Sequence, residues 1–193
     1  GGDEAPTELW GKCPLCREAR TKTGMKDEQE QMRAFFAKTT VLLAKNGQTP
    51  QFWYEGNAGI YHPGETVYAW RQDQALQSIE KTKKAGLNLI MASSEYCYLD
   101  FPQIQGQRNW GWMKTTTLQK CYELDPAFGK PEKEAGHIRG VHAPVWAERL
   151  PDLNHLLYRA YPRACAIAEA GWSPMGVRSW ENFRRKLADH RQF

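Results

Sequence analysis

Two adjacent carboxylic acids, Asp3 and Glu4, follow a pair of glycines at the start of the chain and are the first side chains that could supply an acid and a base. A carboxylic acid that protonates a leaving group and then deprotonates water needs a raised pKa, and a neighbouring carboxylate raises it. An Asp-Glu pair is also common on protein surfaces. This pair therefore predicts catalysis only if the fold brings further polar residues to it.

Aromatic and charged side chains recur directly after each strand that the sequence predicts. The predicted strands span residues 51–53, 66–70, 87–93 and 138–144. The residues at or after their ends are Trp53 and Glu55, Trp70 and Arg71, Tyr98 and Asp100, and Trp146 and Glu148. Any one of these could be an ordinary loop residue. The carboxyl ends of all strands in a parallel barrel open on one face, however, so the repetition at successive strand ends favours one common pocket.

Helices alternate with these strands. Residues 27–46 carry apolar side chains at helical spacing, with Gly47 as a stop, and further helices are predicted at 73–85, 151–161, from the break at Pro162 to 170, and at 179–190. The apolar strands between them predict parallel βα units, in a doubly wound sheet or a barrel. The first ten residues, GGDEAPTELW, are predicted to be the end of a strand that passes into a loop, and the chain is interpreted as the C-terminal portion of a larger protein.

Length and composition limit the classes of function. The 193 residues, 41% hydrophobic and 25% charged, are typical of one globular unit. The net charge of +4 is small and no basic run dominates a segment, so nucleic acid is not an expected partner. No stretch approaches the 18 consecutive apolar residues that a membrane span needs. The 8 Trp, 8 Tyr and 7 Phe, several of them beside polar residues in predicted turns, would suit stacking on sugars.

The cysteines and histidines give little indication of a metal site. Cys13 and Cys16 have the spacing of half a zinc site, but the other three cysteines are scattered and the five histidines lack ligand spacing. No metal and no cofactor is therefore predicted. A zinc- or redox-dependent module built on Cys13 and Cys16 remains an alternative.

Four segments resemble glycoside hydrolase family 20, the β-N-acetylhexosaminidases. GGDEAPTELW (residues 1–10) is similar to the catalytic signature of the family, and YCYLDFPQ (96–103) to its strand-seven Tyr-x-Asp segment. HIRGVHAPVWAERL (137–150) resembles the strand-eight Trp-x-Glu segment, and YPRACAIAEAGWSP (161–174) the helix that closes the barrel. Order, spacing and residue types agree over essentially the whole chain.

The resemblance implies an α/β fold, the C-terminal half of a (β/α)8 TIM barrel from the end of strand four through strand eight and the closing helices. Residues 1–193 would form one partial catalytic barrel, with strands one to three and most of strand four absent. A whole barrel of this kind takes about 250 residues. The sequence before Gly1 should then contain an Arg at an early strand end.

The resemblance also implies a role for each candidate residue. Glu4 would be the general acid/base, Asp3 would orient the substrate acetamide and offset the charge of an oxazolinium intermediate, and Tyr98 would donate to the acetamide oxygen. Most glycosidases separate their two carboxylates by several ångströms, whereas this family is substrate-assisted, so an adjacent pair fits it. The residues that would bind the sugar are Asp100 and Glu148, at the outer hydroxyls, and Trp53, Trp70, Trp112 and Trp146, as pocket walls. Trp110 is an alternative to Trp112.

The implied function is removal of non-reducing terminal β-linked GlcNAc or GalNAc from an oligosaccharide or glycoconjugate, without a cofactor. A periplasmic or secreted location follows from the resemblance only. Two alternatives remain: a member of the same family that releases a disaccharide, and a carbohydrate-binding relative without activity. Glu148 could also simply pair with Arg149 or Arg163.

Overall fold

The structure is a computed structural model that describes residues 5–57, 60–109 and 111–190. Its centre is a sheet of four parallel strands in the order β1-β2-β3-β4, so that each strand pairs with the next one along the chain. The strands are β1 (Gln51–Trp53), β2 (Thr66–Ala69), β3 (Asn88–Met91) and β4 (Ile138–Val141). The parallel βα units that the sequence predicted are confirmed, and their sequential pairing is the arrangement of the (β/α)8 barrel that the family resemblance implied.

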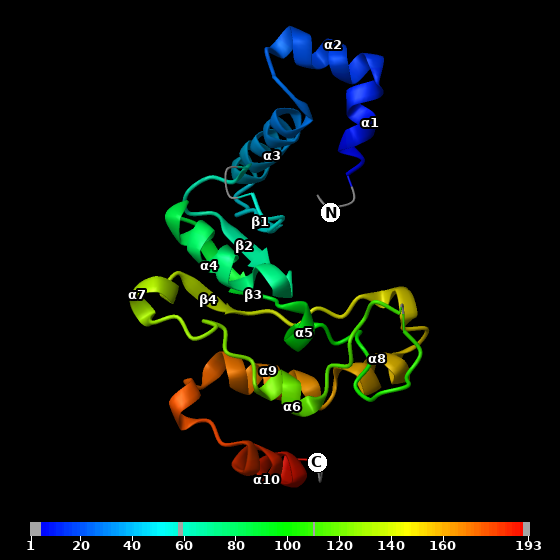
Figure 1. Cartoon of the computed structure of the whole chain (residues 1–193), viewed down its shortest axis with the longest axis vertical. Coiled ribbons are helices and arrows are strands. Elements are labelled where there is room, and N and C mark those ends of the chain that lie inside the picture. Colours follow the sequence, from blue (N-terminus) through cyan, green and yellow to red (C-terminus); the bar gives the residue numbers. More distant parts are fainter. Residues whose placement is uncertain (1–4, 58–59, 110, 191–193) are drawn as a thin grey trace.

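Helices surround this sheet. Figure 1 shows α1, α2 and α3 beyond the β1 side of the sheet and α6, α8, α9 and α10 beyond the β4 side. The helices are α1 (Thr7–Lys12), α2 (Pro14–Thr23), α3 (Glu28–Lys45), η2 (Gln72–Gln74), α4 (Ala75–Lys84), α5 (Ser94–Cys97), α6 (Leu118–Tyr122), α7 (Glu132–Ala135), η3 (Ala147–Arg149), α8 (Leu153–Ala160), α9 (Arg163–Trp172), η4 (Met175–Val177) and α10 (Trp180–His190).

Local signals account for the long helix α3 and its attachment to the sheet. Asp27 accepts a hydrogen bond from the main-chain N–H of Glu30 at 2.8 Å, which satisfies one N–H of the first turn. Gly47 follows the helix with a φ of 71°, a conformation that favours glycine. Thr40 donates to the buried Glu65 at 3.1 Å, so α3 is tied to the loop before β2.

The two faces of the sheet differ. Val67, Ala69, Leu89 and Met91 are fully or almost fully buried and belong to one core cluster with residues of the covering helices. On the other face Tyr68 and Ile90 are only half-buried, and they alternate with the buried residues as the pleat requires. In a closed barrel this second face is the interior.

The predicted strands and most helices are confirmed; β1 has the predicted bounds, and the other three strands are shorter than expected. One expectation is wrong: residues 7–10 are not a loop after a strand, because α1 begins at Thr7, directly after Pro6 and with Glu8 in its first turn. Residues 1–4, which include the predicted strand end, lie outside the described residues. The helix α2 was not predicted; Pro14 occupies its first position and Gly24, with a φ of 71°, follows its end.

Candidate active site at the carboxyl ends of the strands

Aromatic side chains from all four strand ends meet in one row. The ring centroids of Trp53 and Trp146 are 5.6 Å apart, those of Trp146 and Tyr98 6.2 Å, and those of Tyr98 and Trp70 6.4 Å with nearly parallel planes. These residues are far apart in the sequence: Trp53 is the last residue of β1, and Trp70, Tyr98 and Trp146 lie after β2, β3 and β4. The structure thus brings together four of the predicted site residues.

Trp70 is fixed by the neighbouring strand end. Its indole N–H donates to Glu55 at 3.0 Å, and the same carboxylate pairs with Arg71 at 3.2 Å. The guanidinium of Arg71 lies 4.2 Å from the Trp70 ring centroid. A cation near an indole and a bonded indole N–H restrict the ring to one orientation, which suits a wall of a binding pocket.

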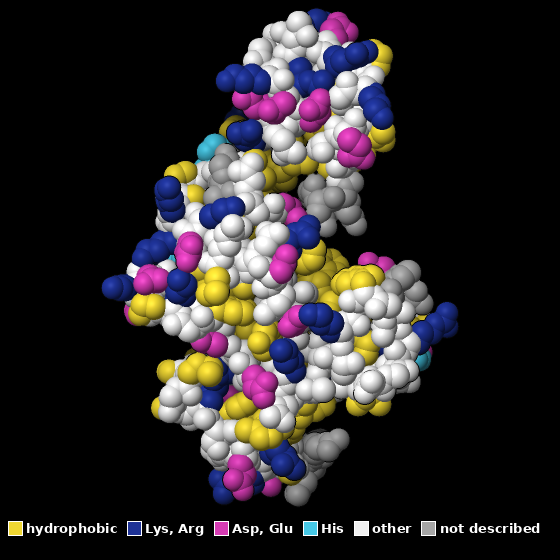
Figure 2. Space-filling view, viewed as in Figure 1, with side chains coloured by type: hydrophobic (Ala, Val, Ile, Leu, Met, Phe, Trp, Pro, Cys, Tyr) yellow, Lys and Arg dark blue, Asp and Glu magenta, His cyan; other side chains and the backbone are white. Residues whose placement is uncertain are grey.

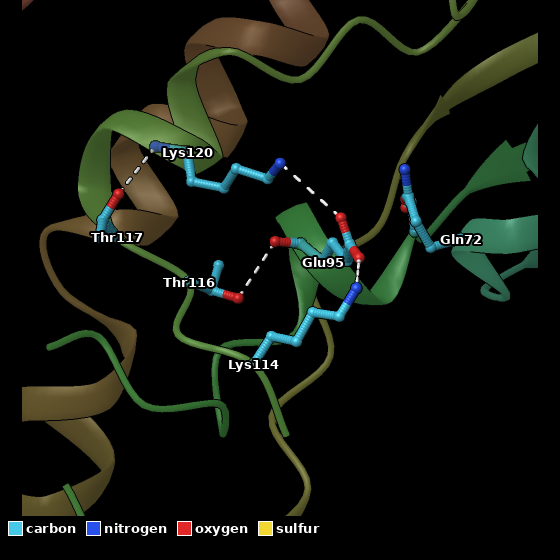
Figure 3. A network of polar contacts seen from close by, with 7 residues as sticks. Gln72, Glu95, Lys114, Thr116, Thr117 and Lys120 are labelled. Carbon is cyan, nitrogen blue, oxygen red and sulfur yellow. Dashed lines mark hydrogen bonds and ion pairs between the residues drawn. The ribbon is translucent and has the colours of Figure 1, made fainter. Parts of the chain in front are cut away.

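The segment that carries Tyr98 is anchored by an ionic network, shown in Figure 3. Glu95 in α5 contacts Lys114, and its other oxygen lies 3.7 Å from Lys120. Thr116 donates to the main-chain carbonyl of Glu95 at 3.1 Å. Tyr98, the residue directly after α5, is the buried member of the aromatic row. The network therefore holds the helix that immediately precedes the predicted acetamide-binding residue.

Asp100 is a buried carboxyl between two strand ends. The pKa of Asp100 is raised to about 6, mainly by burial; the main-chain N–H groups of Asp100 and Trp146 lower it, and the nearby charge of Glu148 contributes a smaller increase. The other carboxylate oxygen, Oδ1, is buried and has no hydrogen-bond partner among the described residues. An unsatisfied buried carboxylate oxygen is costly, and a ligand hydroxyl would satisfy it.

The remaining predicted residues lie at the edge of this row. Trp112 is 64% exposed and packs edge-on against Phe101, with 5.5 Å between the ring centroids. Phe101 in turn packs edge-on against Tyr98, with 5.4 Å between the ring centroids. Glu148 is exposed and lines a hollow of about 400 Å³ together with Arg108 and Arg159. In Figure 2 hydrophobic side chains gather in the notch between the end of the sheet and the lobe that carries α8. Asp3, Glu4 and Trp110 lie outside the described residues.

Arg163 is a residue whose importance the sequence did not reveal. Its guanidinium is fully buried and donates to the carbonyls of Leu99 at 2.5 Å, Thr116 at 2.9 Å and Arg159 at 2.6 Å. The sequence hypothesis that it pairs with Glu148 differs from this geometry, because its N–H groups are directed to main-chain carbonyls. A signal was present: Arg163 shares one helix face with the buried Ile167 and Ala170, a face otherwise apolar.

No cluster of three or more His, Cys, Asp or Glu side chains that could hold a metal ion occurs within residues 5–57, 60–109 and 111–190. In the same part of the chain no helix is long and apolar enough to cross a membrane. What the strand ends offer is a row of indole and phenol faces with a buried carboxyl beside it. Such a surface can stack on the apolar face of a pyranose and accept hydrogen bonds from its hydroxyls.

Comparison with known proteins agrees with this interpretation. The model of the glycosyl hydrolase family 20 catalytic domain matches residues 1–175. A β-hexosaminidase of Akkermansia muciniphila is 95% identical over 193 residues, which are 100% of this chain and 39% of that protein. The crystal structure of a β-N-acetylhexosaminidase, 95% identical, superposes with a TM-score of 0.95 over 98% of this chain and 40% of its own.

A more distant structure extends the similarity. It is a variant of the Streptomyces plicatus β-hexosaminidase in complex with the product GlcNAc, 31% identical, with a TM-score of 0.69 over 81% of this chain and 32% of its own. The chain therefore spans about two fifths or less of the length of these relatives. From the matched family model and the parallel sheet, the chain belongs to glycosyl hydrolase family 20, and its four strands are part of a (β/α)8 barrel.

Proposed function

We propose that the protein is a glycosidase that removes a non-reducing terminal β-linked N-acetylhexosamine, GlcNAc or GalNAc, from an oligosaccharide or glycoconjugate. The observation that carries this proposal is the row of Trp53, Trp146, Tyr98 and Trp70 at the carboxyl ends of the strands, with the buried Asp100 beside it. The names of the similar proteins and the GlcNAc bound to the Streptomyces structure support the same substrate class.

The proposed chemistry is substrate-assisted and retains the anomeric configuration. The oxygen of the substrate acetamide forms a bond to the anomeric carbon while the glycosidic bond breaks, and Glu4 gives its proton to the departing oxygen. Water then attacks the anomeric carbon and opens the oxazolinium ring, and its proton returns to Glu4. Asp3 binds the acetamide N–H and offsets the positive charge of the ring.

The described residues would place the sugar for this reaction. Tyr98 would donate its hydroxyl to the acetamide oxygen and hold it in line for attack, a contribution of orientation. Asp100 and Glu148 would accept hydrogen bonds from the outer hydroxyls. Trp53, Trp70, Trp112 and Trp146 would supply the walls and exclude bulk water from the reacting bond.

The anomeric configuration of the sugar that is first released tests the proposal. The catalytically active protein that contains this chain is mixed with 4-nitrophenyl β-GlcNAc, and NMR follows the anomeric proton of the product. We expect free GlcNAc to be released as the β-anomer before it mutarotates. Release of the α-anomer, or no release of GlcNAc, would contradict the proposal.

A matched pair of variants assigns the acid. Glu4→Gln should lower kcat by roughly 10²- to 10⁴-fold for a leaving group that needs protonation. Glu18→Gln replaces an exposed carboxylate that pairs with Lys22 on α2 and should leave kcat unchanged. Equal effects of the two substitutions on kcat would show that Glu4 is not the catalytic acid.

A further inference from the structure

Two thiols meet at the amino-terminal end of α2, outside the aromatic row. Cys13 is the residue directly before the helix, and Cys16 lies in its first turn. Both cysteines are free and half-buried, so reagents in solution can reach them. A spacing of three residues across a helix start places both side chains on one side of the helix. Each thiol is close enough to the other to shift its pKa.

The surroundings make the two thiols unequal. The main-chain N–H and the thiol of Cys16, at the start of α2, lower the pKa of Cys13, and the charge of Arg17 adds a smaller effect. The neighbouring Cys13 thiol raises the pKa of Cys16. Thiolates are favoured at helix amino-termini because unpaired N–H groups point at them. Cys13 is therefore suited to attack first and Cys16 to react second.

The other cysteines differ from this pair. Cys97 and Cys121 are fully buried, and burial raises the pKa of both thiols, that of Cys121 to about 12. Cys165 is half-buried in α9 and has no cysteine three residues away. Because no third metal ligand gathers at Cys13 and Cys16 among the described residues, the geometry favours a dithiol over half of a zinc site.

We propose that Cys13 and Cys16 form a redox-active dithiol that exchanges with small-molecule disulfides. The Cys13 thiolate attacks one sulfur of the small disulfide, forms a mixed disulfide with that half and releases the other half as a thiolate. Cys16 loses its proton to solvent, attacks the Cys13 sulfur and releases the second half. Two electrons pass from the cysteine pair to the small disulfide, which becomes two thiols, while Cys13 and Cys16 become one disulfide. This site is independent of the proposed hydrolase function.

A redox titration of the catalytically active protein tests the proposal. The protein is equilibrated with defined mixtures of reduced and oxidised glutathione, quenched with acid, alkylated with N-ethylmaleimide and mapped by mass spectrometry. We expect one intramolecular disulfide between Cys13 and Cys16 that forms and disappears reversibly. The proposal would be overturned if the peptide with Cys13 and Cys16 stayed fully reduced while Cys165 was already glutathionylated. One equivalent of zinc bound to the pair in the purified protein would also overturn it.

Single substitutions separate the two thiols. Cys16→Ser should trap glutathione on Cys13, because the second thiol is missing, and Cys13→Ser should react with glutathione disulfide roughly tenfold more slowly than Cys16→Ser. Cys165→Ser is the matched control and should leave the titration of the pair unchanged. Equal trapping rates in Cys13→Ser and Cys16→Ser would contradict the assigned order of attack.

Discussion

In the folded protein, the surroundings of Asp100 disfavour the charged form of its carboxyl group. The carboxyl is 5% exposed, and burial raises its pKa to about 6, whereas an unfolded chain restores an ordinary value near 4. Because the folded-state pKa is the higher one, this group favours the folded state below pH 4, and that contribution is lost as the pH rises through 6. The residue proposed to bind sugar hydroxyls thus lowers stability at neutral pH, as binding groups often do.

Asp100→Asn should therefore stabilise the protein at alkaline pH and weaken sugar binding. The amide does not ionise, so the free energy of unfolding at pH 8 should rise by up to about 3 kcal/mol, and by much less at pH 4. Urea unfolding at both pH values measures this difference. Asp73→Asn, at an exposed carboxyl in η2, is the control and should show no such pH-dependent gain. A variant less stable than the parent at pH 8 would contradict the account.

Tyr98→Phe should reduce kcat on the order of tenfold with little change in KM, because it removes one oriented hydrogen bond to the reacting acetamide and no charge. Tyr96→Phe provides a matched control two residues away. The Tyr96 ring packs against Phe128 and lies under Lys120, away from the aromatic row. Steady-state kinetics of both variants give the comparison, and an equal loss in both would indicate damage to α5 in place of a role in the reaction.

At this scale the sequence predicted the site residues that repeat at strand ends. Trp53, Trp70, Tyr98 and Trp146 meet because all four strands are parallel, so that their carboxyl ends lie at the same edge of the sheet. The buried contacts of Arg163 could not be predicted in the same way. Its partners are main-chain carbonyls, which every residue has, so no residue type in the sequence marks them.

Among the elements, α9 acts on the site through Arg163. This side chain joins the segment after β3 to the segment before α6, since Leu99 and Thr116 both accept from it. Leu99 lies between Tyr98 and Asp100, and its own N–H donates to the carbonyl of Pro144 at 2.9 Å, on the segment after β4. We infer that Arg163 is a positioning residue that fixes two proposed sugar-binding residues from behind.

Arg163→Met should lower both the stability and kcat. The substitution leaves buried carbonyls unpaired, which costs about 2 to 4 kcal/mol, and frees the segment that holds Tyr98. Arg178→Met is a close control, because Arg178 also donates to main-chain carbonyls, those of Tyr122 and Leu124, each at 2.8 Å, away from the aromatic row. Thermal unfolding gives the melting temperatures of the two variants, and kcat is then measured below both temperatures. Equal kcat values in the two variants would show that Arg163 only stabilises the fold.

The helices differed in how well the sequence predicted them. The helix α3 has an Asp at its start, apolar residues at helical spacing and a glycine after its end, and all three signals agree. The helices α1 and α2 were missed because Thr7–Lys12 buries no described residue and α2 buries only Arg20. Without an apolar face, periodicity gives no signal for a helix.

At the scale of the whole molecule, one face of the described sheet resembles a barrel interior, but the described residues contain no strands that would enclose this face. Among the described residues β1 pairs only with β2 and β4 only with β3, and the face with Tyr68 and Ile90 is half-exposed. Parallel sheets in this fold class are covered on both faces. We propose that further strands of the family's barrel pair with β1 and β4 and enclose the aromatic row, a step that the family resemblance implied and that strand counting alone could not give.

The central claim is that a sugar held by this aromatic row provides its own nucleophile. The most direct test compares kcat/KM of the active protein for two substrates with the same leaving group, 4-nitrophenyl β-GlcNAc and 4-nitrophenyl β-glucoside. The glucoside has a hydroxyl in place of the acetamide and so lacks the attacking oxygen. We expect its kcat/KM to be lower by orders of magnitude. Comparable values for the two substrates, or a sugar covalently trapped on Asp3 or Glu4, would contradict the account.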